Sequence, residues 1–430
     1  MIARISHTER LEGSVAAPSS KNYTTRYILV SCLANGISEV RHPADNDDAK
    51  ALIECCRALG AEITEKDNSL LIRGFGNHPR NPGVLNPHNA GAVLRFLLGI
   101  GALLPEVNFI TDYPDSLGKR PNEDLLKALE QLGVETDSDN GHLPITLKSG
   151  RLHGGNVRVS GAKSSQYVSS LLFLAPLIGK DVTIKVTEGL KSKPLIETTL
   201  EVLCKAGISL KAGRGLREFF IPGGQRYTTG TYEVNGDYPG ASAILAAAAI
   251  TRSNVTISRL FEDSQGERAA LRVLRKMGTH IVHKNDSVTI SSDGTLTGVE
   301  FNGDRATDAV LSMVAAACFA QGTSRFYNVE NLRFKECDRI SESLEELKKI
   351  GVRADEKHDE IIIHGSPEGY EGDIEVDAHN DHRVIMMLTI VGLGCKKGLN
   401  ISNAHHVSKS YPDFFEDVQS IGAGVTLRHK

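Results

Sequence analysis

Hydrophobic and polar positions repeat along the chain with a period of about 72 residues. In each period, an amphipathic helical pattern ends at an apolar-Gly step and is followed by an extended segment. The glycines are Gly60, Gly133, Gly207, Gly278, Gly351 and Gly422, with spacings of 73, 74, 71, 73 and 71. Because glycine readily adopts the left-handed conformation that ends a helix, the pattern predicts six helices, each followed by a strand.

A second helical pattern recurs in the same register and is apolar on nearly every face. Its first turns are marked by Lys21, Gly91, Ser164, Asp237, Asp308 and Asp381, with spacings of 70, 73, 73, 71 and 73. A helix that is hydrophobic all round is buried, so these helices are predicted to be polar only where they begin. Helix N-termini carry free N–H groups and a partial positive charge, so several at one surface would bind anions.

Six copies of a strand-plus-two-helix unit predict an α/β fold and divide naturally into two domains of three. Gly/Pro/Ser-rich runs near residues 20 and 236 are the candidate crossing points. We expect residues 21–235 to form one domain, and residues 1–20 with 236–430 to form the other, although length alone leaves open to which domain the first twenty residues belong.

Composition limits the partners. The 430 residues carry 49 cationic and 53 acidic side chains, a net charge of −4, which gives no global field for nucleic acid. The longest apolar runs fall short of the roughly 20 residues that a membrane span needs. The N-terminus has no signal-peptide pattern, and the seven cysteines contain no CxxC pair. We expect a cytoplasmic, monomeric protein whose partners are small molecules, without nucleic acid or membrane.

The common cofactor motifs are missing from the sequence. It contains no Walker loop, no HExxH, no GxSxG and no paired Cys/His ligand spacing. His405 and His406 are adjacent and have no supporting ligands. We therefore expect neither a metal nor a cofactor.

Polar residues at the buried helix starts are the first candidates for binding. They comprise Lys21 and Arg26, Gly91 and Arg95, Arg120 before a proline, and the run Ser164, Ser165 and Gln166. Taken singly, a Ser, Asn or Asp at such a position is usually only a helix cap. If these residues were only independent helix caps, a lysine or arginine would not be expected beside so many of the helix starts.

The segment ENLRFKECDRI, residues 330–340, holds six charged side chains in eleven positions. Its alternation predicts a strand with Leu332 and Phe334 on one face and Asn331, Arg333 and Lys335 on the other. The next segment predicts a helix with a buried stripe formed by Ile340, Leu344, Leu347 and Ile350. Lys335, Glu336 and Arg339 would then lie at a strand-to-helix junction.

Further charges stand at two later positions: Asp381, His382 and Arg383 at a helix start, and Lys409. Several cations and a few carboxylates at helix N-termini could hold two phosphorylated substrates while an acid and a base move protons.

Several of these motifs, including SSKNYTTR, NAGAVLR, GAKSSQYVSSLLFLAPL, NLRFKECDRI and DHRVIMM, resemble the EPSP synthase (3-phosphoshikimate 1-carboxyvinyltransferase) family. The resemblance runs from about residue 10 to the C-terminus. It implies a two-domain inside-out α/β barrel of six βαβαββ-type units, three per domain, with the active site in the interdomain cleft. It also implies transfer of the enolpyruvyl group of phosphoenolpyruvate (PEP) to the 5-hydroxyl of shikimate 3-phosphate, releasing phosphate in the shikimate pathway of aromatic amino acid biosynthesis.

The resemblance implies roles for individual residues. The catalytic residues would be Lys21, Asp308 and Glu336. PEP would be bound by Lys21, Gly91, Arg120, Gln166, Arg339, Arg383 and Lys409. Shikimate 3-phosphate would be bound by Asn22, Arg26, Ser164, Ser165, Gln166, Ser192, Asp308, Asn331 and Lys335. Asp308 would be the base, and Glu336 with Lys21 would transfer the proton at the enol carbon. His382 would either support the site or be structural.

The sequence departs from the family pattern chiefly on the acceptor side. Asn22 stands where serine is usual, Leu195 where the family has a tyrosine, Ala92 where threonine is usual, and Phe96 where proline is common. Two alternatives therefore stay open. One is a carboxyvinyltransferase for another acceptor, such as a nucleotide or a UDP-sugar. The other is a non-catalytic protein that binds phosphorylated metabolites, although binding alone does not need placed acids.

Overall fold

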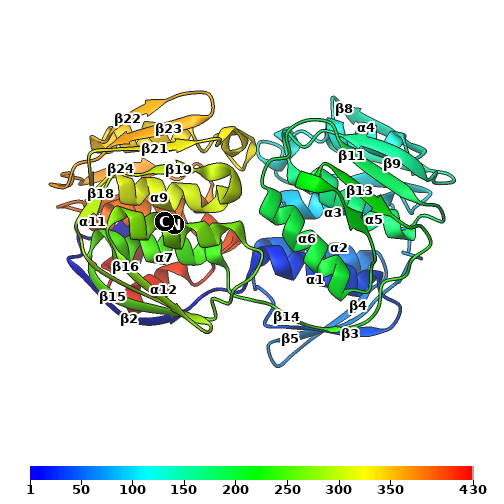
Figure 1. Ribbon diagram of the computed structural model, residues 1–430, viewed down its shortest axis with the longest axis horizontal. Helices are drawn as coiled ribbons and strands as arrows, with labels where there is room; N and C mark the ends of the chain where they lie inside the picture. The colour runs from blue at the N-terminus through cyan, green and yellow to red at the C-terminus, as the bar shows by residue number, and fades with distance from the viewer. Residues whose placement is uncertain (429–430) are drawn as a thin grey trace. The chain divides into compact units, whose positions relative to one another are not determined.

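The computed structural model describes residues 1–428, and the chain folds into two compact units. The middle unit is Ser19–Val234, and the terminal unit combines Met1–Pro18 with the chain from Asn235 onward. Each unit has its own hydrophobic core. Figure 1 shows each unit as a mixture of helices and sheets.

The middle unit contains the following helices and strands in chain order: α1 Lys21–Leu33, β3 Ile37–Arg41, α2 Asp47–Ala58, β4 Glu62–Lys66, β5 Ser69–Arg73, β6 Val84–Leu85, α3 Gly91–Gly101, β7 Glu106–Phe109, η1 Leu117–Lys119, α4 Glu123–Glu130, β8 Val134–Asp139, β9 His142–Ser149, β10 Gly155–Val159, α5 Ser165–Leu174, η2 Ala175–Leu177, β11 Val182–Val186, α6 Lys193–Lys205, β12 Lys211–Ala212, η3 Arg214–Leu216, β13 Glu218–Ile221 and β14 Thr231–Glu233. The η elements are 3-10 helices.

The terminal unit begins with β1 Ile2–Ile5 and β2 Arg10–Ala16. After the middle unit it continues with α7 Tyr238–Ile250, β15 Arg252–Ser258, η4 Gly266–Arg268, α8 Ala269–Met277, β16 His280–Lys284, β17 Ser287–Asp293, β18 Leu296–Thr297, β19 Glu300–Asn302, η5 Gly303–Arg305, η6 Thr307–Ala309, α9 Val310–Ala317, β20 Ala320–Gln321, β21 Thr323–Tyr327, η7 Glu330–Phe334, α10 Ser341–Ile350, β22 Arg353–Glu356, β23 Glu360–His364, β24 Ile374–Asp377, α11 His382–Gly394, β25 Leu399–Ser402, η8 Ala404–Lys409, α12 Phe414–Ser420 and β26 Val425–Arg428.

The larger sheets all share one strand pattern. Within residues 1–428 there are six four-stranded sheets, three per unit, and one two-stranded sheet, β18-β20. The middle unit has the orders β14-β3-β5-β4, β6-β7-β9-β8 and β10-β11-β13-β12, and the terminal unit has β24-β25-β1-β26, β2-β15-β17-β16 and β19-β21-β23-β22. In each four-stranded sheet one edge pair is parallel and the other two pairs are antiparallel. The N-terminal strands are tied to the terminal unit because β1 pairs with β25 and β26, and β2 pairs with β15.

The apolar helices are buried as the sequence predicts. In the terminal unit α7, α9 and α11 pack against one another, and Figure 1 shows α7 and α9 side by side. Every residue of α7 from Tyr238 to Ala249 is buried. The many alanines of this helix leave room for close packing of neighbouring backbones. No helix among residues 1–428 is long and apolar enough to cross a membrane.

The six glycines that end the amphipathic helices all have positive φ, between 80° and 120°. At Gly351, for example, the N–H bonds to the carbonyl of Lys348 as α10 ends, with φ of 99°. This confirms the prediction of a glycine helix end in each period.

The predicted strand over residues 331–335 is wrong. Residues Glu330–Phe334 form the 3-10 helix η7, in which the Leu332 N–H bonds to the carbonyl of Val329. Arg333 holds this turn, since its guanidinium contacts Asp338 at 2.8 Å and Glu356 at 3.0 Å. These bonds, one of them to the distant strand β22, outweigh the alternation of polar and apolar residues. The buried stripe on α10 is confirmed for Ile340, Leu344, Leu347 and Ile350.

Candidate active site

Arg339 is the centre of the charged residues in the terminal unit. Its side chain is 1% exposed. Its Nε donates to Asp381 at 2.8 Å, Nη1 to Asp308 at 3.1 Å, and Nη2 to Glu336 at 2.9 Å. Burial opposes the charge on the guanidinium, but the carboxylates of Asp381, Glu336 and Asp308 outweigh it and raise the pKa of Arg339. One arginine thus holds three acids that lie far from one another in the sequence.

Glu336 lies between two cations. Besides Arg339, the ammonium of Lys409 lies 3.1 Å from its Oε1. Both side chains are nearly buried, with exposures of 5% for Lys409 and 7% for Glu336. The short η8 helix supplies Lys409, whereas Glu336 stands in the loop before α10. A carboxylate so placed can exchange a proton while the two cations balance its charge.

Asp308 is shared by two cations. Its Oδ1 lies 3.1 Å from Nη1 of Arg339 and 3.7 Å from Nζ of Lys335. It stands in η6, directly before the buried helix α9. Asn331 is close by in the fold, since its amide donates to the Thr307 hydroxyl at 3.0 Å. We call Asp308, Lys335, Glu336, Arg339, Asp381 and Lys409 the acid–base cluster.

The start of α11 supplies the remaining charged side chains. Asp381 caps this helix by accepting the N–H of Arg383 at 2.7 Å. The guanidinium of Arg383 is buried and lies 3.8 Å from Asp237, the cap of α7. Single ligand atoms of Glu336, Asp381 and His382 lie within 4.8 Å of one another, so they could in principle hold a metal ion. Arg339 already contacts both of these acids, which favours their role as its counter-charges.

In the middle unit, Lys21 opens α1 and pairs with a buried acid. Its ammonium lies 3.1 Å from Asp48, which is 2% exposed. Asp48 lies in the first turn of α2 and escaped the sequence analysis, because an acid there normally only favours the helix dipole. Asn22 follows Lys21, and its carbonyl accepts from Arg26 at 2.9 Å.

Arg26 is a buried guanidinium with neutral partners. It is 1% exposed and donates to the Thr199 hydroxyl at 2.9 Å, to the Asn22 carbonyl, and to the Leu195 carbonyl at 3.2 Å. Burial lowers its pKa to about 10. Among the residues that the structure describes, no carboxylate forms an ion pair with Arg26. Thr199 in turn contacts Ser169, so Arg26 is tied to α6 and α5 together.

Arg120 and Gly91 are brought together at the start of α3. A Cβ at Gly91 would come within 2.4 Å of Nη1 of Arg120, so only a glycine leaves space for the guanidinium there. Arg120 is 7% exposed and follows η1. The pair therefore presents a guanidinium beside a helix N-terminus, which is a suitable geometry for an anion.

The start of α5 is organised by Arg95. Ser164 caps the helix by accepting the N–H of Gln166 at 3.2 Å, and Ser165 behind it is buried. Nη1 of Arg95 donates to the side-chain oxygen of Gln166 at 2.7 Å. Ser192 precedes α6 with the left-handed φ of 51° and is 7% exposed. The hydroxyl of Ser164 therefore acts as a cap, and Arg95 fixes the orientation of Gln166.

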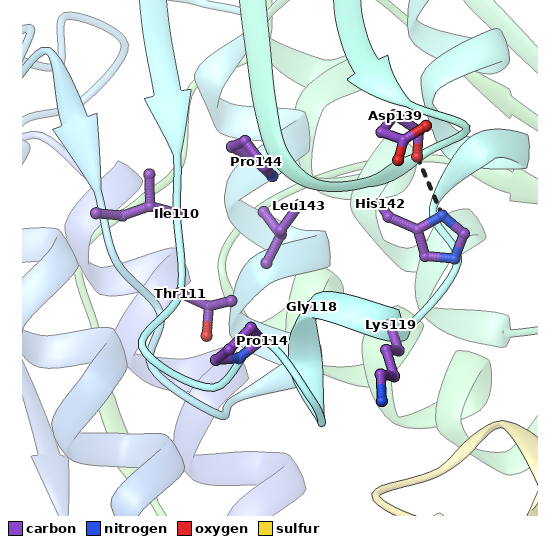
Figure 2. A pocket seen from close by; sticks show the side chains of 9 residues that line it. All are labelled: Ile110, Thr111, Pro114, Gly118, Lys119, Asp139, His142, Leu143 and Pro144. Atoms are coloured by element: carbon purple, nitrogen blue, oxygen red, sulfur yellow. Dashed lines mark hydrogen bonds between the residues drawn. The ribbon is translucent and has the colours of Figure 1, made fainter.

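A separate cavity of about 510 Å³ lies in the middle unit. Figure 2 shows its lining, which comes from the loop after β7, from η1, from the end of β8 and from the start of β9: Ile110, Thr111, Pro114, Gly118, Lys119, Asp139, His142, Leu143 and Pro144. None of the residues predicted to bind a substrate lines this cavity. The neighbouring Arg120 is directed to Gly91 instead.

The chain is thus a mixed α/β protein in which cations and carboxylates stand together at helix starts. Comparison with known proteins identifies its family. The chain belongs to the EPSP synthase (3-phosphoshikimate 1-carboxyvinyltransferase) family, whose model matches residues 5–418.

Several relatives span nearly the whole chain. It is 47% identical to the 3-phosphoshikimate 1-carboxyvinyltransferase of Deinococcus radiodurans over 96% of this chain and 94% of that one. It is 37% identical to the one of Burkholderia pseudomallei over 98% and 94%. The solved structure of EPSP synthase from Acinetobacter baumannii shares the fold, with a TM-score of 0.81, 23% identity and 99% coverage of both chains. The family resemblance of the motifs is thereby confirmed, and with it the enzyme class of carboxyvinyltransferase.

Proposed function

We propose that the protein transfers the enolpyruvyl group of PEP to the 5-hydroxyl of shikimate 3-phosphate and releases phosphate. The observation that carries this proposal is the sharing of Arg339 between two acids, Glu336 at 2.9 Å and Asp308 at 3.1 Å. The reaction needs one group to protonate a carbon and another to take a proton from a hydroxyl. Two carboxylates held on one guanidinium meet that requirement.

The chemistry proceeds by addition and elimination. Protonation of the PEP methylene carbon makes C2 electrophilic, and the acceptor hydroxyl attacks C2 as it loses its proton. The resulting tetrahedral adduct then loses phosphate and a methyl proton to give the enol ether. We assign the hydroxyl proton to Asp308, and proton transfer at the methylene carbon to Glu336 and Lys21.

The remaining assignments concern binding. We propose that PEP is held by Lys21, Gly91, Arg120, Gln166, Arg339, Arg383 and Lys409. We propose that the acceptor is held by Asn22, Arg26, Ser164, Ser165, Gln166, Ser192, Asp308, Asn331 and Lys335. The hydrogen-bond partners of Arg26 in the protein are neutral. This supports the binding of an anionic ligand by Arg26, because a buried cation without a carboxylate is stabilised when an anion binds. Side chains supply the positive charge, so we propose that no metal or cofactor is needed.

The finer architecture is also a proposal. We infer that the chain is an inside-out α/β barrel of six βαβαββ-type units, three in each unit of the fold. The shared strand pattern of the six four-stranded sheets supports this inference. We further propose that a single chain is the active species and that it works in the cytoplasm on small-molecule substrates, without a nucleic acid or membrane partner.

Phosphate release from PEP tests the function directly. The purified protein is assayed with and without shikimate 3-phosphate, in the presence of EDTA. We expect release only when shikimate 3-phosphate is present, at a rate unaffected by EDTA. PEP binding by calorimetry without any release would instead indicate a different acceptor, with Asn22 and Leu195 as the reason for the change.

Leu195 offers a test of the acceptor. It lies in the first turn of α6, three residues after Ser192, and its side chain is partly exposed. We expect Leu195→Tyr to tighten shikimate 3-phosphate binding by about fivefold, because one added hydrogen bond contributes about 1 kcal/mol. Calorimetric titration measures this. Leu195→Phe, which adds the ring without the hydroxyl, is the matched control, and an unchanged or weaker titration of Leu195→Tyr would count against this acceptor.

A further inference from the structure

Glu267 is a buried acid outside every motif that the sequence analysis singled out. It lies in η4, the single 3-10 turn before α8, and is 4% exposed. This turn packs against α7, α8 and η6. The backbone N–H of Asp308 in η6 donates to Oε1 of Glu267 at 3.4 Å. Glu267 therefore touches the segment that carries the proposed base.

The charged groups around Glu267 are mainly acidic. Asp237, at the start of α7, and Asp308, in η6, are the two carboxylates whose charges act on it. Arg268 beside it pairs with Glu262 at 2.9 Å instead. The charged side chains of α8 are exposed, namely Arg272, Arg275 and Lys276. Within residues 1–428, no cation forms an ion pair with Glu267.

The neighbouring acids, unlike Glu267, lie beside cations. Asp308 contacts Arg339 and Lys335, and Asp237 has Arg383 at 3.8 Å. Burial, followed by the charges of Asp308 and Asp237, raises the pKa of Glu267 to about 8. At neutral pH the side chain of Glu267 is therefore a neutral carboxylic acid.

We propose that Glu267 is a positioning residue that holds the Asp308 segment as a neutral acid, and that its ionisation suppresses turnover. The proposal rests on the proposed function, in which Asp308 is the base. An ionised Glu267 would add a second negative charge beside Asp308, where a phosphorylated acceptor has to bind. It would also repel the carboxylate of Asp308, the residue whose backbone N–H it now accepts.

The variant Glu267→Gln separates the hydrogen bond of Glu267 from its ionisation. Glutamine keeps the shape of the side chain and an acceptor oxygen, but it stays neutral at every pH. In the wild type, kcat/KM should fall about tenfold between pH 7 and pH 9, as a protonated group with a pKa of about 8 is lost. We expect this fall to be absent in Glu267→Gln. A matched control is Glu346→Gln, which removes a buried glutamate that accepts the Asp377 N–H at 3.1 Å and pairs with Lys349. The control should keep the alkaline fall.

Stability gives a readout that does not depend on activity. The folded pKa of about 8 lies above the unfolded value of about 4.3, so the folded state holds an extra proton between these values. The stability contributed by Glu267 is complete below the unfolded pKa and is lost as pH rises through the folded pKa. The Tm of the wild type should therefore fall relative to that of Glu267→Gln between about pH 5 and pH 8.

The outcomes are distinct. If neither the wild type nor the variant releases phosphate, the proposed function fails, while the Tm difference still tests the state of Glu267. If Glu267→Gln keeps the alkaline fall and shows no pH-dependent Tm difference, the proposal for Glu267 is overturned. Should Glu267→Gln not fold, the infrared band of a protonated carboxyl in the wild type decides the question. That band should disappear between about pH 7 and pH 9, and its absence at pH 7 would also overturn the proposal.

Discussion

Arg339→Met is expected to lower the free energy of unfolding by about 3–5 kcal/mol, because it leaves buried acids without their counter-charge. Arg339 is 1% exposed and contacts Asp308, Glu336 and Asp381. Methionine retains an unbranched side chain of similar length, so the loss would come from charge and hydrogen bonding rather than from a large cavity. Urea unfolding at pH 7 measures the difference. Turnover should be lost as well, since both proposed proton-transfer acids would lose their common partner.

Acidification provides an internal check on this first prediction. Without the guanidinium, the carboxylates of the cluster would have raised pKa values in the folded variant, so the variant loses stability as pH rises. The difference from the wild type should therefore shrink toward pH 4 and below, at about the ordinary pKa values of Asp and Glu. Arg325→Met is the matched control, because Arg325 also pairs with a glutamate, Glu360, but is 40% exposed. It should cost only about 0–1 kcal/mol, and an equal loss in both variants would contradict the special role of Arg339.

Glu336→Gln is expected to lower kcat by about 10²-fold or more while substrate binding stays nearly intact. Glutamine preserves the shape of the side chain, and its single amide oxygen can still accept from one of the two cations, Arg339 or Lys409, which now bind separate carboxylate oxygens at 2.9 Å and 3.1 Å. It cannot give or take a proton, so the loss should appear in turnover. Steady-state phosphate release gives kcat, and calorimetry with PEP and shikimate 3-phosphate gives the binding constants.

A matched control for the second prediction is Glu342, six residues further along the chain. Glu342 belongs to α10 and faces His379 at 3.5 Å rather than the acid–base cluster. Glu342→Gln should therefore leave kcat within about twofold of the wild type, because Glu342 is partly exposed and, within the described residues, contacts no member of the acid–base cluster through an ion pair. Near-normal turnover of Glu336→Gln would remove Glu336 from the proton-transfer role. A loss of binding in place of turnover would make it a binding residue.

The sequence by itself determined the features that depend on local burial. The 72-residue period, the apolar helices and the glycines that end the amphipathic helices all follow from which side chains must leave water and which backbone angles glycine allows. The resemblance of the motifs correctly identified the family, because the charged residues at the helix starts belong to short, contiguous sequence motifs.

Tertiary structure decided which charges meet. Arg339 contacts Asp308 and Asp381, which lie 31 and 42 residues away, and Glu267 touches a segment 41 residues further along the chain. The alternation that predicted a strand over residues 331–335 gave way to a 3-10 turn in which Arg333 bonds to Asp338 and to Glu356 of β22. Periodicity reports whether a segment is buried, whereas an ion pair depends on where separate segments cross. The acid–base cluster and the acid at Glu267 therefore became visible only in the folded chain.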